Sequence, residues 1–176
     1  LYGCTKLQCI PPEIGQLSNL RELDLRACKL SRLSPRLGGA LTNKLEILDI
    51  SFSKDLICIP REVLDVMRKL RKLSMARCSW LNAEYLLIQG IRQSDSLEYL
   101  NINFNDIKPK DYEELLTTLP SHFPRLMVLN ACPDYRSTSS KEYIETIAPR
   151  IAQFEDQNTV RYLFLANKKT DGNTKP

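Results

Sequence analysis

Hydrophobic residues recur along this chain with one fixed spacing. The motif is LxxLxLxxCxL, and it is set by Leu20, Leu23, Leu25, Cys28 and Leu30. It starts again at residues 45, 70, 97 and 126, so the successive units are 25, 25, 27 and 29 residues long, and a shorter copy spans residues 160–165. Because side chains on a strand alternate between its two faces, each LxL core predicts a short strand with one buried face.

Recurrence in phase at this period predicts an array of stacked repeats, each of which adds one strand to a common sheet. We therefore treat residues 1–176 as a single domain. Its predicted repeats are residues 1–19, 20–44, 45–69, 70–96, 97–125 and 126–158, followed by a closing strand and tail at 159–176. Residues 1–11 align with residues 50–60, so the first unit begins inside the motif, and we expect the protein to continue N-terminally into further domains.

The segments between the strands must return along the other side of the array. Residues 11–17 predict a turn or a single helical turn, and the longer units predict helices that begin at Pro60, Asn82 and Pro109 and run to residues 70, 91 and 117. A capping box at residues 139–142 predicts one more helix over residues 143–154, kinked at Pro149. We expect the final strand at residues 159–165.

The repeated motif resembles that of leucine-rich repeat proteins over nearly the whole chain. The resemblance implies an α/β solenoid, a horseshoe with a concave parallel β-sheet and with helices or turns on the convex side. Residues 4–20, which contain CxxL, IPxxIG and LxxL, resemble scaffold proteins of Ras-type signalling and plant immune receptors. Residues 70–78 and 97–105 resemble the repeats of F-box-type ubiquitin-ligase substrate receptors.

These resemblances imply a module that binds a partner protein or peptide on its concave face, and one form of that role is a ubiquitin-ligase substrate receptor. The immune-receptor likeness implies instead a sensor or autoinhibitory part. A structural spacer or scaffold is the alternative from a different class. The sequence lacks GxxxxGK[ST], GxGxxG, HExxH and GxSxG, so we expect no enzyme, no catalytic residue and no cofactor.

The neighbours of the buried leucines should form columns of side chains across the concave face. The expected columns are residues 22, 47, 72, 99, 128 and 162; residues 24, 49, 74, 101, 130 and 164; residues 2, 26, 51, 76 and 103; and residues 27, 52, 77 and 104. Because aromatic and arginine side chains dominate interface energetics, we predict that the partner-binding residues are Asp24, Arg26, Asp49, Phe52, Lys72, Arg77, Tyr99, Asn101, Asn103 and Phe104. For Phe52 and Phe104, a structural stack along the turns is the alternative.

Charge and cysteine content narrow the class of partner and the compartment. The net charge of +4, from 25 basic and 21 acidic residues, is too small for a nucleic-acid binder, and the sequence contains no run of about 18 apolar residues that would span a membrane.

Two groups of cysteines share motif positions, Cys4, Cys28 and Cys78 in one and Cys9 and Cys58 in the other. We expect buried free thiols, not disulfides or a metal site, and hence a cytoplasmic or nuclear protein. The single histidine, His122, is expected in a loop without a catalytic role.

Overall fold

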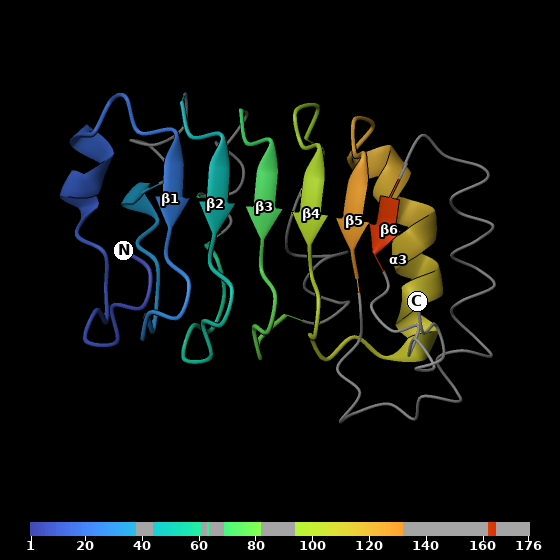
Figure 1. Cartoon of the computed structure of the whole chain (residues 1–176), viewed down its shortest axis with the longest axis horizontal. Helices are drawn as coiled ribbons and strands as arrows, with labels where there is room; N and C mark the ends of the chain where they lie inside the picture. Colours follow the sequence, from blue (N-terminus) through green and yellow to red (C-terminus); the bar gives the residue numbers. More distant parts are fainter. Residues whose placement is uncertain (38–43, 61–62, 64–68, 82–93, 132–161, 165–176) are drawn as a thin grey trace, which may run out of the picture.

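The strands of this protein form one six-stranded parallel sheet whose order follows the chain, β1-β2-β3-β4-β5-β6 (Figure 1). The computed structural model describes residues 1–37, 44–60, 63, 69–81, 94–131 and 162–164. Each strand has three residues: β1 is Glu22–Asp24, β2 Ile47–Asp49, β3 Lys72–Ser74, β4 Tyr99–Asn101, β5 Val128–Asn130 and β6 Tyr162–Phe164. This arrangement confirms the predicted α/β solenoid and its strand phase.

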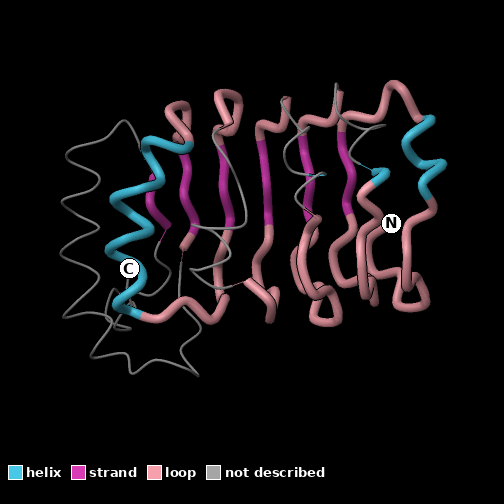
Figure 2. The backbone as a smooth tube through the Cα atoms, turned by 180° about the vertical axis from the view of Figure 1, so that it is seen from behind, coloured by secondary structure: helices cyan, strands magenta, loops and turns pink. Residues whose placement is uncertain are grey.

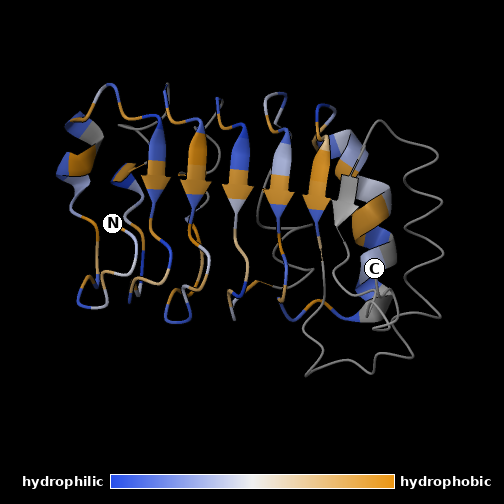
Figure 3. Cartoon of the chain, viewed as in Figure 1, coloured by the Kyte–Doolittle hydropathy of each residue, from blue (hydrophilic) through white to orange (hydrophobic). Residues whose placement is uncertain are grey.

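The core lies behind the sheet and is built from the two inward residues of each motif. The central residues of β1 to β5 are at most 6% exposed: Leu23, Leu48, Leu73, Leu100 and Leu129. The second inward residues are at most 1% exposed: Leu25, Ile50, Met75, Ile102 and Ala131. Because burying one leucine contributes about 1.5–3 kcal/mol, the repeated motif is a main source of stability. Among β1 to β5, strands β2 and β5 are the most hydrophobic (Figure 3), since they add Ile47 and Val128 on the outward face.

Two helices have all their residues described, and they lie on the return side of the array (Figure 2); Arg36, Leu37 and Val63 are also helical. The short 3₁₀ helix η1, Pro12–Gln16, confirms the single helical turn predicted near residues 11–17. The α-helix α3, Pro109–His122, begins at Pro109 as predicted and lies beside β5 and β6 (Figure 1). The hydroxyl of Tyr112, which is 1% exposed, donates a hydrogen bond to the carbonyl of Ala131 at 2.8 Å. This bond ties α3 to the end of β5.

Helix α3 is longer than the sequence predicted, because it passes residue 117 and includes Pro120. Its apolar face continues through the last turn, where Leu116 and Leu119 are both 4% exposed, so packing outweighs the helix-breaking tendency of proline. The prediction that His122 lies in a loop is therefore wrong. His122 is the last residue of α3, and its Nδ1 forms a 2.9 Å hydrogen bond with the carbonyl of Thr118.

Several predicted elements fall outside the described residues. These are most of the helix over residues 60–70, the helix over residues 82–91 and the kinked helix over residues 143–154. The closing strand is confirmed as β6. Within the described part of the chain, no helix has the length and apolarity needed to cross a membrane.

Candidate partner-binding surface

The predicted columns of side chains exist on the outward face of the sheet, the face opposite the buried leucines. The strand register pairs Glu22 with Ile47, Ile47 with Lys72, Lys72 with Tyr99, and so on to β6. The same pairing places Lys72 and Tyr99 side by side at the centre of the first column. The second column contains three of the predicted binding residues: Asp24, Asp49 and Asn101.

The acceptor side chains of the second column have a structural role in the backbone. Oδ1 of Asp24 accepts the backbone N–H of Arg26 at 3.0 Å, and Oδ1 of Asp49 accepts that of Ser51 at 2.9 Å. Oδ1 of Asn101 repeats the contact with Asn103 at 3.1 Å. Each side chain thus forms an Asx turn two residues long, which bends the chain out of the strand. This need explains why Asp and Asn recur here, independently of any partner.

Arg26, a predicted binding residue, is already paired within the molecule. Its guanidinium forms bidentate hydrogen bonds with the Asp24 carboxylate, the shortest of them 2.7 Å. Its Nε also lies 3.7 Å from Oδ2 of Asp49. It also lies 4.8 Å above the ring of Tyr2. Hydrogen bonding to Arg26 lowers the pKa of Asp24, and the same bond raises the pKa of Arg26. Much of the charge at this end of the face is therefore neutralised internally.

The residues just after the strands share a left-handed backbone conformation. Five successive turns show it at the same motif position: Gly3, Ala27, Phe52, Arg77 and Phe104 have φ angles of 71°, 55°, 63°, 54° and 59°. A bulky residue in this region of φ is uncommon, and the conformation costs an L-residue about 1–2 kcal/mol. The turn itself requires the conformation, since Gly3 and Ala27 adopt it without large side chains.

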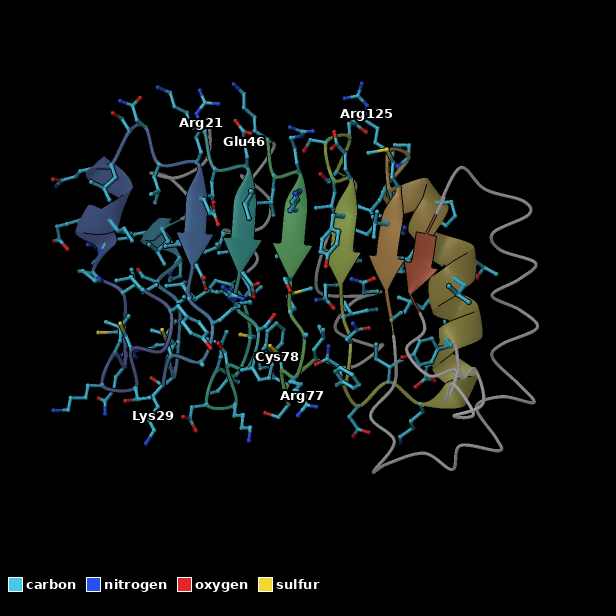
Figure 4. The ribbon with its side chains drawn as sticks, in the orientation of Figure 1. Arg21, Lys29, Glu46, Arg77, Cys78 and Arg125 are labelled. Carbon is cyan, nitrogen blue, oxygen red and sulfur yellow. The ribbon has the colours of Figure 1, made fainter. Side chains whose placement is uncertain are left out.

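Three of these five residues form a stacked row, which we call the turn ridge: Phe52, Arg77 and Phe104. The guanidinium carbon of Arg77 lies 5.7 Å from the Phe52 ring centre and 4.8 Å from that of Phe104. Phe52 is 46% exposed, Arg77 is exposed and Phe104 is half-buried. The arginine therefore stands between the two predicted aromatic residues, at the edge of the sheet where the strands end (Figure 4).

The opposite side of the sheet, where the strands begin, carries an alternating row of charges that was not predicted from the sequence. Arg21 pairs with Glu46 at 2.7 Å, and Arg71 pairs with Glu98 at 2.7 Å; Arg21 and Glu46 are labelled in Figure 4. The bond to Arg71 lowers the pKa of Glu98, and the same bond raises the pKa of Arg71. The signal in the sequence was the alternation of sign at the residue before each of the first four strands, once per repeat.

The centre of the outward face is less open than the columns suggested. Ser51 and Ser74 are only 2% and 9% exposed, and their hydroxyls share a 2.8 Å hydrogen bond. Oγ of Ser51 also accepts the backbone N–H of Ala76, which is 7% exposed. Lys72 is exposed beside them, while Tyr99 is half-buried and its hydroxyl accepts a 2.8 Å hydrogen bond from the Asn130 amide. Lys72 and Tyr99 are thus the prominent groups at mid-sheet.

The five described cysteines are free thiols, but three of them are not buried as predicted. Cys28 and Cys78 are buried, whereas Cys4, Cys9 and Cys58 are exposed. Cys4 is exposed because it lies on the first turn of the stack, where a neighbouring turn covers it on one side only. Cys9 and Cys58 are exposed because their shared motif position lies outside the buried interior of the turns. Burial raises the pKa of Cys78 to about 12. Among the described residues, no group of three or more His, Cys, Asp or Glu side chains is placed to hold a metal ion.

Comparison with known families agrees with this geometry. The Leucine Rich Repeat family matches residues 19–41, the stretch that contains β1 and the turn at Ala27. The match supports a leucine-rich repeat protein, a class that generally serves as a protein-interaction module. None of the curated proteins matches the chain.

Proposed function

We propose that this chain binds a partner protein on the outward face of its sheet, at the surface around Lys72 and Tyr99. The observation that supports this location is the contrast between the two ends of the face. At β1 and β2 the charged side chains of Asp24 and Arg26 bind each other. At β3 and β4 the ammonium group of Lys72 has no ion pair within the described residues, and it stands next to the fixed ring of Tyr99.

Such a pair suits protein recognition. Tyrosine provides a large apolar area with a polar tip and loses little conformational entropy on binding. The Asn130 amide already fixes the Tyr99 hydroxyl, so less ordering is needed when a partner binds.

The more specific role that we propose is that of a substrate receptor in a ubiquitin ligase, in the cytoplasm or nucleus. Residues 70–78 and 97–105, which resemble the repeats of F-box-type receptors, are the repeats that contain Lys72 and Tyr99. Five described cysteines without disulfides agree with a reducing compartment.

A structural spacer is the second candidate, and the Asx turns favour it. Asp24, Asp49 and Asn101 are fully explained by backbone hydrogen bonds, so their presence on the face requires no partner. The spacer role makes no use of the neighbouring Lys72 and Tyr99 side chains.

A capture experiment from cell extract distinguishes these roles. The double variant Lys72→Ala/Tyr99→Ala is compared with Leu17→Ala/Arg36→Ala, which removes one basic and one large apolar side chain from exposed positions outside the strands. We expect the first variant to lose proteins that the native chain and the control retain. Cullin or adaptor proteins among the retained set support the ligase role. Identical recovery by all three forms contradicts binding at this face.

A further inference from the structure

Arg77 has no acidic partner among the described residues, in contrast to three arginines in or next to the strands of the sheet. Arg21, Arg26 and Arg71 pair with Glu46, Asp24 and Glu98 respectively. The guanidinium of Arg77 makes no hydrogen bond or ion pair with any described residue; its described contacts are with the rings of Phe52 and Phe104. Its N–H donors are therefore available to an outside acceptor.

The two rings also orient this cation. A guanidinium is planar and stacks on aromatic faces, which leaves the N–H groups along its edge directed away from the rings. Stacking between Phe52 and Phe104 restricts the rotamers of Arg77 before any partner arrives. An arginine held in this way is suited to a planar acceptor that takes two parallel hydrogen bonds, such as a carboxylate.

The backbone of the turns does not require these three side chains. Gly3 and Ala27 occupy the same left-handed position in the first two turns, and glycine adopts it without steric cost. In the turn ridge, large residues are retained at φ angles of 63°, 54° and 59° in three consecutive turns. Since the turn and not the side chain sets this conformation, the shape of the backbone does not account for the three large side chains.

The charge of the surrounding turns favours an anionic ligand. The five turns span residues 3–7, 27–31, 52–56, 77–81 and 104–108, and they contain five basic residues but only two acidic ones. The basic side chains are Lys6, Lys29, Lys54, Arg77 and Lys108. This edge of the sheet thus carries most of the net charge of the chain, which is +4 overall.

We propose that the turn ridge is a carboxylate-binding site: Arg77, clamped between Phe52 and Phe104, binds an aspartate or glutamate side chain in an acidic segment of a partner protein. The proposal names the partner chemistry of the protein-interaction role proposed above and rests on that role. The two rings provide the apolar walls beside the carboxylate, and Lys54 and Lys29 add attraction at longer range along the same edge.

Fluorescence anisotropy with a defined probe tests the proposal. The probe is a labelled peptide of alternating glutamate and serine, and the comparison probes are its glutamine counterpart and a labelled single-stranded DNA of equal length. We expect the glutamate peptide to bind saturably and at least about 10-fold more tightly than the glutamine peptide, because charge-assisted bidentate bonds are lost in the latter. Equal binding of both peptides, no saturable binding, or preference for the DNA overturns the proposal.

Substitutions distinguish binding by Arg77 stacked between the two rings from binding by overall positive charge. Arg77→Gln and Arg77→Lys should both weaken glutamate-peptide binding about 10-fold, since lysine keeps the charge but lacks the planar fork. Phe104→Leu should weaken it as well while leaving Arg77 in place. Arg125→Gln, which removes an exposed arginine at the opposite edge of the sheet (Figure 4), should bind like the native chain. Circular dichroism checks that each variant is folded.

The outcomes for the clamp and for partner binding are separable. If Arg77→Lys binds like the native chain, only net charge matters and the clamp is refuted. If Arg77→Gln fails with the peptide but captures the same cellular proteins as the native chain, the ridge is not the partner site while protein binding at Lys72 and Tyr99 stands. If the double variant at Lys72 and Tyr99 also captures the same proteins, the proposed function fails independently.

Discussion

The side-chain amide of Asn105 holds the turn that contains Cys78. Its Oδ1 accepts the backbone N–H of Cys78 at 2.7 Å, and its Nδ2 donates to the carbonyls of Met75 and Ile102, both at 2.8 Å. Asn105 is 2% exposed. One buried amide therefore satisfies backbone groups of two consecutive repeats, at the motif position that Cys28 and Ser53 occupy in earlier turns.

Replacing Asn105 by leucine should be strongly destabilising. Three buried backbone groups would lose their partners, and each unpaired group costs about 1–3 kcal/mol, so we expect a loss of roughly 3 kcal/mol or more in the free energy of unfolding, measured by urea denaturation. Asn101→Ala is the control, because its described contact is a single hydrogen bond at a half-buried position. Equal losses for the two variants would show that the Asn105 amide is not the element that joins the repeats.

The strand phase is tested by two adjacent residues of β4. Leu100 is fully buried, so Leu100→Asp places an uncompensated charge in the shared core, and we expect it to prevent folding at ordinary temperature. Tyr99→Ala removes a side chain from the outward face and should cost only about 1 kcal/mol. Thermal unfolding followed by circular dichroism compares them. Comparable damage from both substitutions is the result that would refute the assigned phase.

Glycine substitutions should have opposite effects on stability at two neighbouring kinds of turn position. Ala27 has φ 55°, so Ala27→Gly relieves steric strain and should raise the free energy of unfolding by up to about 1 kcal/mol, net of unfolded-state entropy. Ala76 precedes the left-handed residue of its own turn and is 7% exposed. Ala76→Gly should therefore destabilise by about 1 kcal/mol. Chemical denaturation gives both values, and the opposite signs are the decisive result.

Thiol chemistry should separate the described cysteines into two groups. Burial raises the pKa of Cys78 to about 12, so its reactive thiolate is scarce at neutral pH, and Cys28 is only 3% exposed. Iodoacetamide should modify Cys4, Cys9 and Cys58 in the folded protein and should reach the two buried thiols only after unfolding. Peptide mass mapping with and without denaturant measures this order. Rapid modification of Cys78 in the native state would contradict the packing of its turn.

Acid should weaken the contact between Asp24 and Arg26. The hydrogen bonds from Arg26 lower the pKa of Asp24 from its ordinary value of 3.8, so the stability that they contribute is present above that value and is lost as pH falls through the lower folded-state pKa. The stability difference between the native chain and Asp24→Asn should therefore shrink between about pH 5 and pH 2. Urea unfolding at several pH values measures it, with the exposed turn residue Asp55→Asn as control. A difference independent of pH would rule out the ion pair as its source.

At the predicted binding surface, the repeat pattern determined which residues are neighbours but not which of them are paired or buried. Columns such as Lys72 beside Tyr99 were predictable, because one period and one alternation fix which residues lie next to each other in a parallel sheet. The neutralisation of Arg26 by Asp24 was not, because it depends on a turn that folds two residues back onto each other. The burial of Ser51 and Ser74 likewise depends on their mutual hydrogen bond, which no spacing specifies.

By itself the sequence determined the solenoid, the phase of its strands and the inward leucines, since these follow from a local motif that every repeat applies in the same way. Tertiary structure alone decided how far α3 extends past Pro120, which arginines are paired, and the stacking of Arg77 between Phe52 and Phe104. Those features depend on three-dimensional packing: on the buried face of α3, on the acidic groups within reach of each arginine, and on the turns one repeat before and after Arg77. Side-chain geometry and competing charges there select one contact from several that the sequence allows.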